Sequence, residues 1–130
     1  MIERPVRIVL DTSAILAYVR GSIDVGETIG EVHDDGARIG LPVLSLVEGH
    51  KATVEKDWLD RLLDHHASAI LGVPGSDWRA LAVMYDSVEP MDAAATALAA
   101  IDLGCLLLTG RPDLYAGSAV ADRIIALPAQ

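Results

Sequence analysis

Phenylalanine is absent from the 130 residues, and aromatic side chains of all kinds make up only 4% of the chain. The hydrophobic core must therefore be built mainly from Ala, Val, Leu and Ile. The same scarcity argues against the aromatic stacking platforms with which RRM and OB domains bind single-stranded nucleic acid. The single cysteine, Cys105, permits no internal disulfide and fits a reducing compartment.

Positive charge is also scarce. Lysine occurs only at positions 51 and 56, the net charge is −9 and the isoelectric point is near 4.6. A protein that binds nucleic acid through phosphate neutralisation alone is expected to be basic. Any contact with phosphates by this chain therefore requires bound cations or a local patch of arginine.

Long apolar runs are missing as well. No stretch approaches the roughly 18 apolar residues of a membrane span, and the short run Val6–Leu10 lacks the cleavage site of a signal peptide. We expect no membrane segment and a soluble, cytoplasmic protein. A hydrophobic fraction of 52% excludes a disordered chain. The length matches one domain over residues 1–130.

Short apolar runs alternate with longer segments of helical periodicity. Strands are predicted over Val6–Leu10, Arg38–Leu44 with an interruption at Pro42, Ser68–Val73, Cys105–Leu108 and Arg123–Leu127. Helices are predicted after the turn Asp11–Ser13 and over Ser22–His33, Leu46–His50, Val54–His65, Trp78–Tyr85 and Met91–Leu103, the last ending at Gly104. This alternation predicts an α/β fold with three layers, α/β/α, around a mostly parallel sheet of four to five strands.

Acidic residues follow the strands of this predicted sheet. Asp11 is the first polar residue after the first strand, and Glu48 lies beyond the second. Asp92 begins the alanine-rich helix, and Asp113 follows the fourth strand. Functional residues of parallel α/β folds gather at the carboxyl ends of the strands. Carboxylates held together repel one another unless a cation lies between them, and Mg²⁺ or Mn²⁺ is the natural partner for such oxygen ligands.

Each acid also has a purely structural interpretation. Asp11 is well placed to cap the N-terminus of the following helix. Glu48 fits a solvated helix position, and Asp92 is favourable in a first helical turn. Their joint position at successive strand ends favours a metal site with Asp11, Glu48 and Asp92 as ligands, and Asp113 as a further candidate.

Four segments carry a family pattern in this order: residues 7–17 (RIVLDTSAILA), 44–48 (LSLVE), 91–97 (MDAAATA) and 107–115 (LLTGRPDLY). Together they resemble the four motifs of PIN domains, particularly the VapC-like toxin ribonucleases of bacterial toxin–antitoxin modules. The resemblance runs from about Val6 to Leu127 and implies a PIN-like fold. It also implies a homodimer and an antitoxin protein as partner.

The resemblance further implies Mg²⁺- or Mn²⁺-dependent hydrolysis of RNA phosphodiester bonds, with Asp11, Glu48 and Asp92 as the catalytic, metal-holding residues. Thr12 and Ser13 correspond to hydroxyls that orient metal-bound water in the family, although both also suit helix capping. Thr109, at a strand end, is expected to hydrogen-bond an acidic ligand or to be structural.

The fourth motif departs from the family pattern at Arg111, where members with a full acidic set carry Asp or Asn. Arg111 has two opposing interpretations. It can contact a substrate phosphate, for which a guanidinium is well suited, or it can fold into the acidic pocket and replace the metal as a built-in cation. The second predicts weak activity. The alternative function is therefore a catalytically weak or inactive PIN-fold protein that binds protein or RNA.

Overall fold

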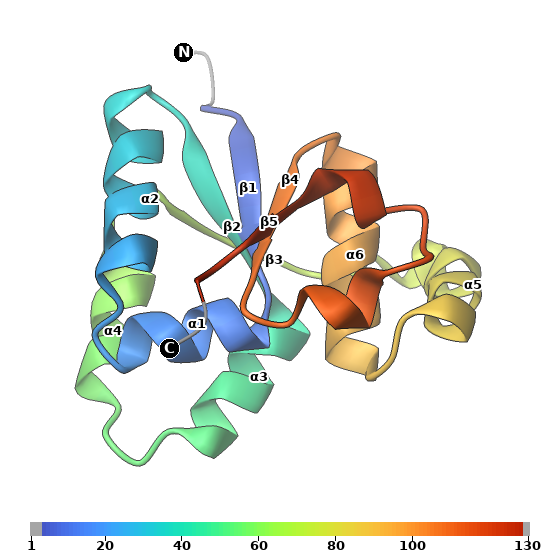
Figure 1. Ribbon diagram of the computed structural model, residues 1–130, viewed down its shortest axis with the longest axis horizontal. Coiled ribbons are helices and arrows are strands. Elements are labelled where there is room, and N and C mark those ends of the chain that lie inside the picture. The colour runs from blue at the N-terminus through green and yellow to red at the C-terminus, as the bar shows by residue number, and fades with distance from the viewer. Residues whose placement is uncertain (1–3, 129–130) are drawn as a thin grey trace.

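A five-stranded parallel sheet runs through the centre of the computed structural model, which describes residues 4–128 (Figure 1). The strands are β1 (Val6–Leu10), β2 (Arg38–Pro42), β3 (Ser68–Leu71), β4 (Leu106–Thr109) and β5 (Ile124–Ala126). Their order is β3-β2-β1-β4-β5, and every neighbouring pair is parallel. The predicted α/β class is confirmed. The first strand of the chain lies in the middle of the sheet.

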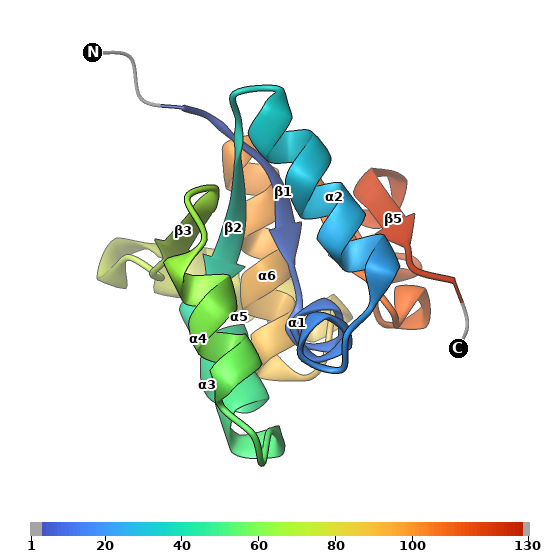
Figure 2. The same cartoon turned by 90° about the vertical axis from the view of Figure 1, so that its left-hand side faces the viewer.

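Six α-helices surround this sheet within the described residues: α1 (Thr12–Val19), α2 (Ile23–Asp34), α3 (Val43–Ala52), α4 (Asp57–Asp64), α5 (Trp78–Ser87) and α6 (Met91–Leu103). Helices α1, α2 and α4 cover one face, and α5 and α6 cover the other, which gives the predicted three layers (Figures 1 and 2). Helix α3 contacts both α1 and α6. None of the described helices is long and apolar enough to cross a bilayer.

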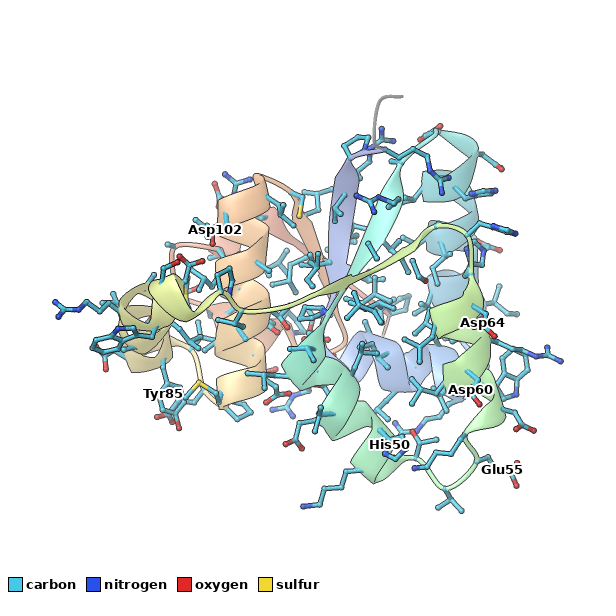
Figure 3. All side chains as sticks on the ribbon, turned by 180° about the vertical axis from the view of Figure 1, so that it is seen from behind. His50, Glu55, Asp60, Asp64, Tyr85 and Asp102 are labelled. Carbon is cyan, nitrogen blue, oxygen red and sulfur yellow. The ribbon has the colours of Figure 1, made fainter. Side chains whose placement is uncertain are left out.

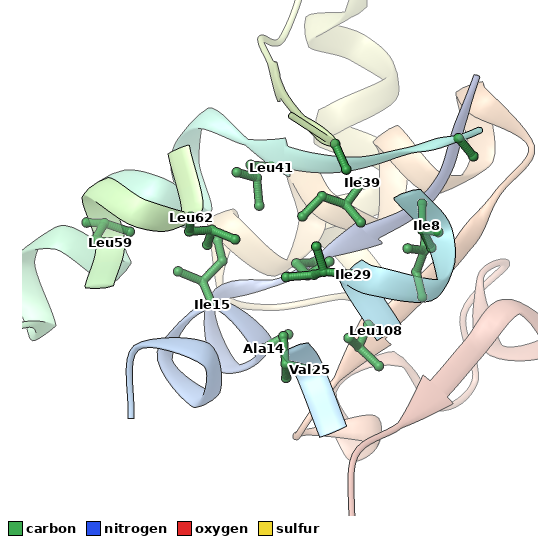
Figure 4. Packing of buried hydrophobic residues seen from close by; sticks show 14 residues of the cluster. Ile8, Ala14, Ile15, Val25, Ile29, Ile39, Leu41, Leu59, Leu62 and Leu108 are labelled. Carbon is green, nitrogen blue, oxygen red and sulfur yellow. The ribbon is translucent and has the colours of Figure 1, made fainter. Parts of the chain in front are cut away.

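The core is almost entirely aliphatic, as the composition predicts. Successive residues of β1 point to opposite faces of the sheet. Ile8 and Leu10 therefore join the cluster under α1, α2 and α4, whereas Val9 joins the cluster under α6. Figure 4 shows the first cluster, in which Leu59 and Leu62 of α4 pack over the sheet. Among residues 4–128, the only fully buried Trp or Tyr ring is that of Tyr115, in the second cluster.

Three short 3₁₀ turns complete the described chain: η1 (Gly75–Asp77), η2 (Pro112–Tyr115) and η3 (Ala121–Arg123). The turn η2 follows β4 and carries the Tyr115 ring back over the sheet into the core. As predicted, Gly104 ends α6 in the left-handed conformation, with φ at 61°. Cys105, which follows it, is a buried core residue with a free thiol.

Several predicted boundaries are wrong. Val43 and Leu44, predicted as strand, are the first residues of α3. Proline has no N–H to donate to a sheet ladder, so Pro42 ends β2 and precedes the helix in an extended conformation. The helix predicted from Val54 begins at Asp57. Val54 lies in the preceding loop, where it is 94% exposed. The third strand ends at Leu71, two residues before the predicted Val73.

Candidate functional site

Asp11 directly follows the central strand and caps α1. Its backbone N–H donates to the Leu108 carbonyl of β4, which continues the sheet by one residue. Its side chain accepts a hydrogen bond from the N–H of Ala14 in the first turn of α1. The carboxylate is nevertheless almost fully buried, with 2% of the residue exposed. A buried charge is tolerated only when it is well compensated, so its remaining partners matter.

Four donors surround the two oxygens of Asp11. Oδ1 accepts from the Ser13 hydroxyl at 2.6 Å and from the Ala14 N–H at 3.0 Å. Oδ2 accepts from the Thr109 hydroxyl at 2.5 Å and from the Tyr115 hydroxyl at 2.6 Å. An ionised carboxylate offers about four lone-pair positions. The protein itself therefore occupies the hydrogen-bonding capacity of this carboxylate.

The Tyr115 hydroxyl is one of the four donors to the Asp11 carboxylate. Burial of the ring, together with the adjacent Asp11 carboxylate, raises the pKa of the Tyr115 phenol far above its usual range. The raised pKa favours the protonated phenol, whose O–H donates to Asp11 Oδ2.

Asp92, in the first turn of α6, lies opposite the start of α1. Its Oδ2 accepts a hydrogen bond of 2.5 Å from the Thr12 hydroxyl. Its other oxygen, Oδ1, accepts no hydrogen bond from any side chain or N–H of residues 4–128, and the residue is half-buried. Asp92 is therefore fixed in direction by Thr12 and still has one oxygen available for a ligand.

Glu48 lies on α3, which a buried pair of hydroxyls fastens to α6. Ser45 Oγ and Thr96 Oγ1 are 2.9 Å apart, and the Thr96 hydroxyl also contacts the backbone carbonyl of Asp92. Glu48 is three residues after Ser45 and thus on the same side of its helix. The hydroxyl pair therefore holds Glu48 and Asp92 on facing helices. The Glu48 carboxylate is exposed and has no partner in the part of the chain that is described.

Asp11, Glu48 and Asp92 line two cavities, each of about 380 Å³. Glu48 and Asp92 line the first, together with Tyr85 of α5, which Figure 3 labels beside α6. Asp11 and Asp92 line the second, together with Tyr115 and Arg111. Asp92 belongs to both cavities. The three predicted carboxylates thus line two cavities that share Asp92.

The carboxylates suit a divalent ion only in part. Within residues 4–128, no group of three or more His, Cys, Asp or Glu side chains is placed to hold one metal ion. Glu48 and Asp92 do offer unused carboxylate oxygens to the same cavity, and Mg²⁺ is commonly held by one or two carboxylates plus water and substrate phosphate. Asp11 offers no free lone pair. The donor chemistry therefore fits an ion held by Glu48 and Asp92, with Asp11 beside it as a fixed negative charge.

Arg111 and Asp113, both exposed, pair with each other. The guanidinium donates from Nε at 3.3 Å and from Nη2 at 3.1 Å to the two oxygens of Asp113. This hydrogen bonding lowers the pKa of the Asp113 carboxyl. Arg111 lines the cavity that holds Asp11 and Asp92, whereas Asp113 is not among the residues that line it. The guanidinium thus lies at the mouth of the site and its partner lies outside.

Ser13 and Thr109 form a second ring of contacts around Asp11. The Ser13 hydroxyl accepts from the N–H of Gly110 at 2.8 Å and lies 3.2 Å from the Thr109 hydroxyl. The Thr109 hydroxyl also accepts from the N–H of Arg111 at 2.8 Å. The loop after β4 is thereby fastened to the first turn of α1.

No protein-family model matches the chain, and no curated protein matches it. The geometry and chemistry of the site, together with the motifs of the sequence, are therefore the grounds on which a function can be proposed for this protein.

Sequence reasoning singled out neither the Tyr115 hydroxyl nor the pair formed by Ser45 and Thr96. Tyr115 lies 104 residues from Asp11, and nothing in the local pattern marks it as a partner of that acid. One indirect signal is available: in a chain without phenylalanine, a buried ring after the fourth strand is unusual, and a buried tyrosine normally finds a partner for its hydroxyl.

Proposed function

We propose that the protein is a divalent-metal-dependent ribonuclease that resembles the VapC-like toxins of the PIN domain family. One observation carries the proposal: Glu48 and Asp92, with unused carboxylate oxygens, line one cavity at the carboxyl end of a parallel sheet, next to the buried carboxylate of Asp11. Two such acids in one open cavity have an arrangement suited to a cation and a phosphate. The family pattern of the sequence supports RNA as the substrate.

Glu48 and Asp92 are the residues that would hold Mg²⁺ or Mn²⁺. When bound, the ion supplies a water of lowered pKa and stabilises negative charge that develops on the phosphate. Thr12 fixes the orientation of Asp92 through Oδ2 and leaves Oδ1 available to the ligand. Asp11 adds negative charge beside the ion. In this proposal its hydrogen-bonded carboxylate holds the loop after β4 in place.

Arg111 is the cation of this chain that is best placed to contact RNA. It lines the cavity beside Asp11 and Asp92, and 59% of its side chain is exposed. A guanidinium can bind two phosphate oxygens at once. Between the two interpretations of Arg111, its pairing with Asp113 at the mouth of the site favours contact with a substrate phosphate over a built-in cation within the acidic pocket.

The direct test is cleavage of labelled single-stranded and structured RNA in Mn²⁺, with EDTA as the metal-free control. Asp92→Asn and Glu48→Gln should each lower the rate at least tenfold, because each removes a proposed ligand of the ion. Asp102→Asn, on the same helix α6 but exposed at its far end (Figure 3), is a matched control and should keep the wild-type rate. Cleavage that persists in EDTA or in both site variants would contradict the proposal.

One observation favours a second candidate function, a PIN-fold binding module with weak or no nuclease activity. All four hydrogen-bonding positions of Asp11 are taken by protein donors, so this acid is not free to bind a metal. Titration of Mn²⁺ by calorimetry separates the two functions. Absence of binding at millimolar Mn²⁺ would favour the module, whereas binding that is lost in Asp92→Asn favours the enzyme.

A toxin of this kind would act in the cytoplasm, as a homodimer, with an antitoxin protein as partner. Apolar side chains that are exposed on α3 and α4 would suit such contacts, among them Val47 at 59% and Trp58 at 43% exposure. Light scattering on the purified protein tests the dimer. Growth arrest after induced expression tests the toxin role, and unimpaired growth would count against it.

A further inference from the structure

The four donors to Asp11 differ in origin. The Ala14 N–H is part of the helix cap, and the Ser13 hydroxyl comes from the same turn of α1. The Thr109 hydroxyl comes from β4, the strand beside β1. The Tyr115 hydroxyl comes from η2, beyond the end of the sheet. Three donors thus belong to the elements that build the strand end, and one is brought in from outside.

Tyr115 contacts Asp11 through its hydroxyl and lines a cavity together with it. The ring is fully buried in the core cluster under α6, where residues such as Val9 and Ala97 fix its position. Tyr115 and Asp11 line the same cavity of about 380 Å³, as does Asp92. The Tyr115 hydroxyl, 2.6 Å from Asp11 Oδ2, therefore occupies a hydrogen-bonding position of Asp11 beside a cavity that Asp92 shares.

We infer that the Tyr115 hydroxyl withholds Asp11 Oδ2 from a divalent cation, so that the ion is bound by Glu48 and Asp92 without the third carboxylate. The inference rests on the proposed function, because it concerns the metal ion of that same site. Removal of the hydroxyl frees one lone pair of Oδ2 and leaves the ring in the core. Asp11 lines this cavity together with Asp92, one of the two proposed ligands of the ion.

If the Tyr115 hydroxyl instead orients Asp11 for metal binding, its removal should change the metal affinity in the opposite direction. A hydroxyl that orients a metal-ligating carboxylate strengthens metal binding, and its loss typically weakens that binding about tenfold to hundredfold. A hydroxyl that competes with the metal weakens binding, and its loss strengthens it. The sign of the change in affinity therefore distinguishes competition from orientation.

The experiment compares Mn²⁺ affinity of the wild type and Tyr115→Phe by calorimetry and by the electron paramagnetic resonance signal of free Mn²⁺. Tyr115→Phe should bind Mn²⁺ about tenfold to hundredfold more tightly, the factor that corresponds to one hydrogen bond to a charged group. Its melting temperature should also rise more on addition of Mn²⁺ than that of the wild type. Tyr18→Phe is the matched control, since the Tyr18 ring packs against Trp58 and the residue lines neither cavity.

Two further variants show whether any gain passes through Asp11. The gain in affinity should vanish when Tyr115→Phe is introduced into an Asp11→Asn background, because the freed oxygen is then not part of a carboxylate. Thr109→Val removes the other donor to Asp11 Oδ2 and should also tighten Mn²⁺ binding. This variant tests the inference if Tyr115→Phe is too unstable to titrate.

The outcomes separate this inference from the proposed function. Equal or weaker Mn²⁺ binding by Tyr115→Phe, in a protein whose Mn²⁺ binding and RNA cleavage are lost in Asp92→Asn, overturns the inference and leaves the ribonuclease proposal standing. Tighter binding by Tyr115→Phe that also requires Asp11 supports the inference, even if no RNA tested is cleaved. Absence of Mn²⁺ binding in both proteins overturns the inference together with the metal site.

Discussion

Thr12 Oγ1 lies 2.5 Å from Asp92 Oδ2, so the first turn of α1 is joined to the first turn of α6 across 80 residues of chain. The N-terminal turns of two helices thus lie side by side at the carboxyl end of the sheet. Helix N-termini carry partial positive charge, which stabilises nearby carboxylates. In an acidic chain with only two lysines, these helix N-termini help to stabilise Asp11 and Asp92 at the same end of the sheet.

Asp11 and Asp92 should differ in what their substitution does to stability. Asp11→Asn replaces an acceptor by an N–H₂ group that meets donors, and we expect a loss of about 2–3 kcal/mol in unfolding free energy. Asp92→Asn, at a half-buried residue with one hydrogen bond from a side chain, should lose about 1 kcal/mol or less. Urea unfolding of both variants measures the difference. Equal losses would contradict the assignment of Asp11 as the structural centre of the site.

Arg111→Ala should weaken RNA binding and leave the fold intact. The side chain is exposed and its partner, Asp113, is exposed as well, so unfolding by urea should be unchanged. Loss of one phosphate contact should reduce the slope of log affinity against log salt by about 1. Arg61→Ala, on the distant helix α4, is the control for loss of charge. A faster rate for Arg111→Asp than for the wild type in saturating Mn²⁺ would instead support the built-in cation.

Gly40 is required by close packing within the sheet. A Cβ at this position would lie 2.6 Å from Leu71 Cδ1 and 2.9 Å from Val9 Cγ1. Gly40→Ala should therefore lower the unfolding free energy by about 1–3 kcal/mol. Gly26→Ala is the matched control, because Gly26 lies in α2 and a Cβ added there meets no atom of the described residues within 4 Å. It should raise the unfolding free energy by about 0.5–1 kcal/mol. Similar effects at both glycines would contradict the packing argument.

Stability should fall in mild acid because of His65. Burial, followed by the neighbouring His33 and His66, lowers the pKa of His65 below the usual 6.5. Its Nδ1 also accepts a hydrogen bond from the N–H of Ala67, which requires the neutral ring. The unfolded chain therefore binds the proton more readily, and stability that is complete above about pH 6.5 is lost as the pH falls toward the lowered pKa.

Melting temperatures between pH 8 and pH 5 test this dependence. His65→Asn keeps an acceptor near the Ala67 N–H but has no titrating group, so its stability should decline less steeply in acid than that of the wild type. His50→Asn, at an exposed position on α3, serves as the control and should follow the wild-type curve. Identical pH profiles for all three proteins would show that His65 contributes nothing to acid sensitivity.

The order of strands and helices follows from the periodicity of the sequence, and the errors are instructive. Val43 and Leu44 continue an apolar run that begins in β2, so a local pattern assigns them to the strand. Pro42 has no backbone N–H, so the ladder of sheet hydrogen bonds ends there. Packing of α3 against α1 and α6 then favours helix for Val43 and Leu44. Such packing involves residues about 30 and 50 positions away, which a window along the chain does not register.

The candidate site, like the fold, was predicted from the sequence only in part. The position of acids after strands predicted that Asp11, Glu48, Asp92 and Asp113 gather at one edge of the sheet. The structure brings the first three to two cavities that share Asp92, and Asp113 lines neither. The capping role of Asp11, considered as an alternative to a site, is shown by its contact with the Ala14 N–H. How its other three lone pairs are filled depends on hydroxyls whose direction is set only by the complete fold. Whether the acids bind metal stays a prediction.

The separation of Asp11 from Tyr115 along the chain has a consequence for synthesis of the protein. Asp11 leaves the ribosome before Thr109 and Tyr115, which follow 98 and 104 residues later. A nascent chain that stops before β4 contains Asp11 and the donors to its Oδ1. It lacks Thr109 and Tyr115, the two donors to Oδ2. At typical rates of elongation, about 5–20 residues per second, this interval lasts about 5–20 s. The complete set of donors around Asp11 is thus absent from every nascent chain that ends before Tyr115.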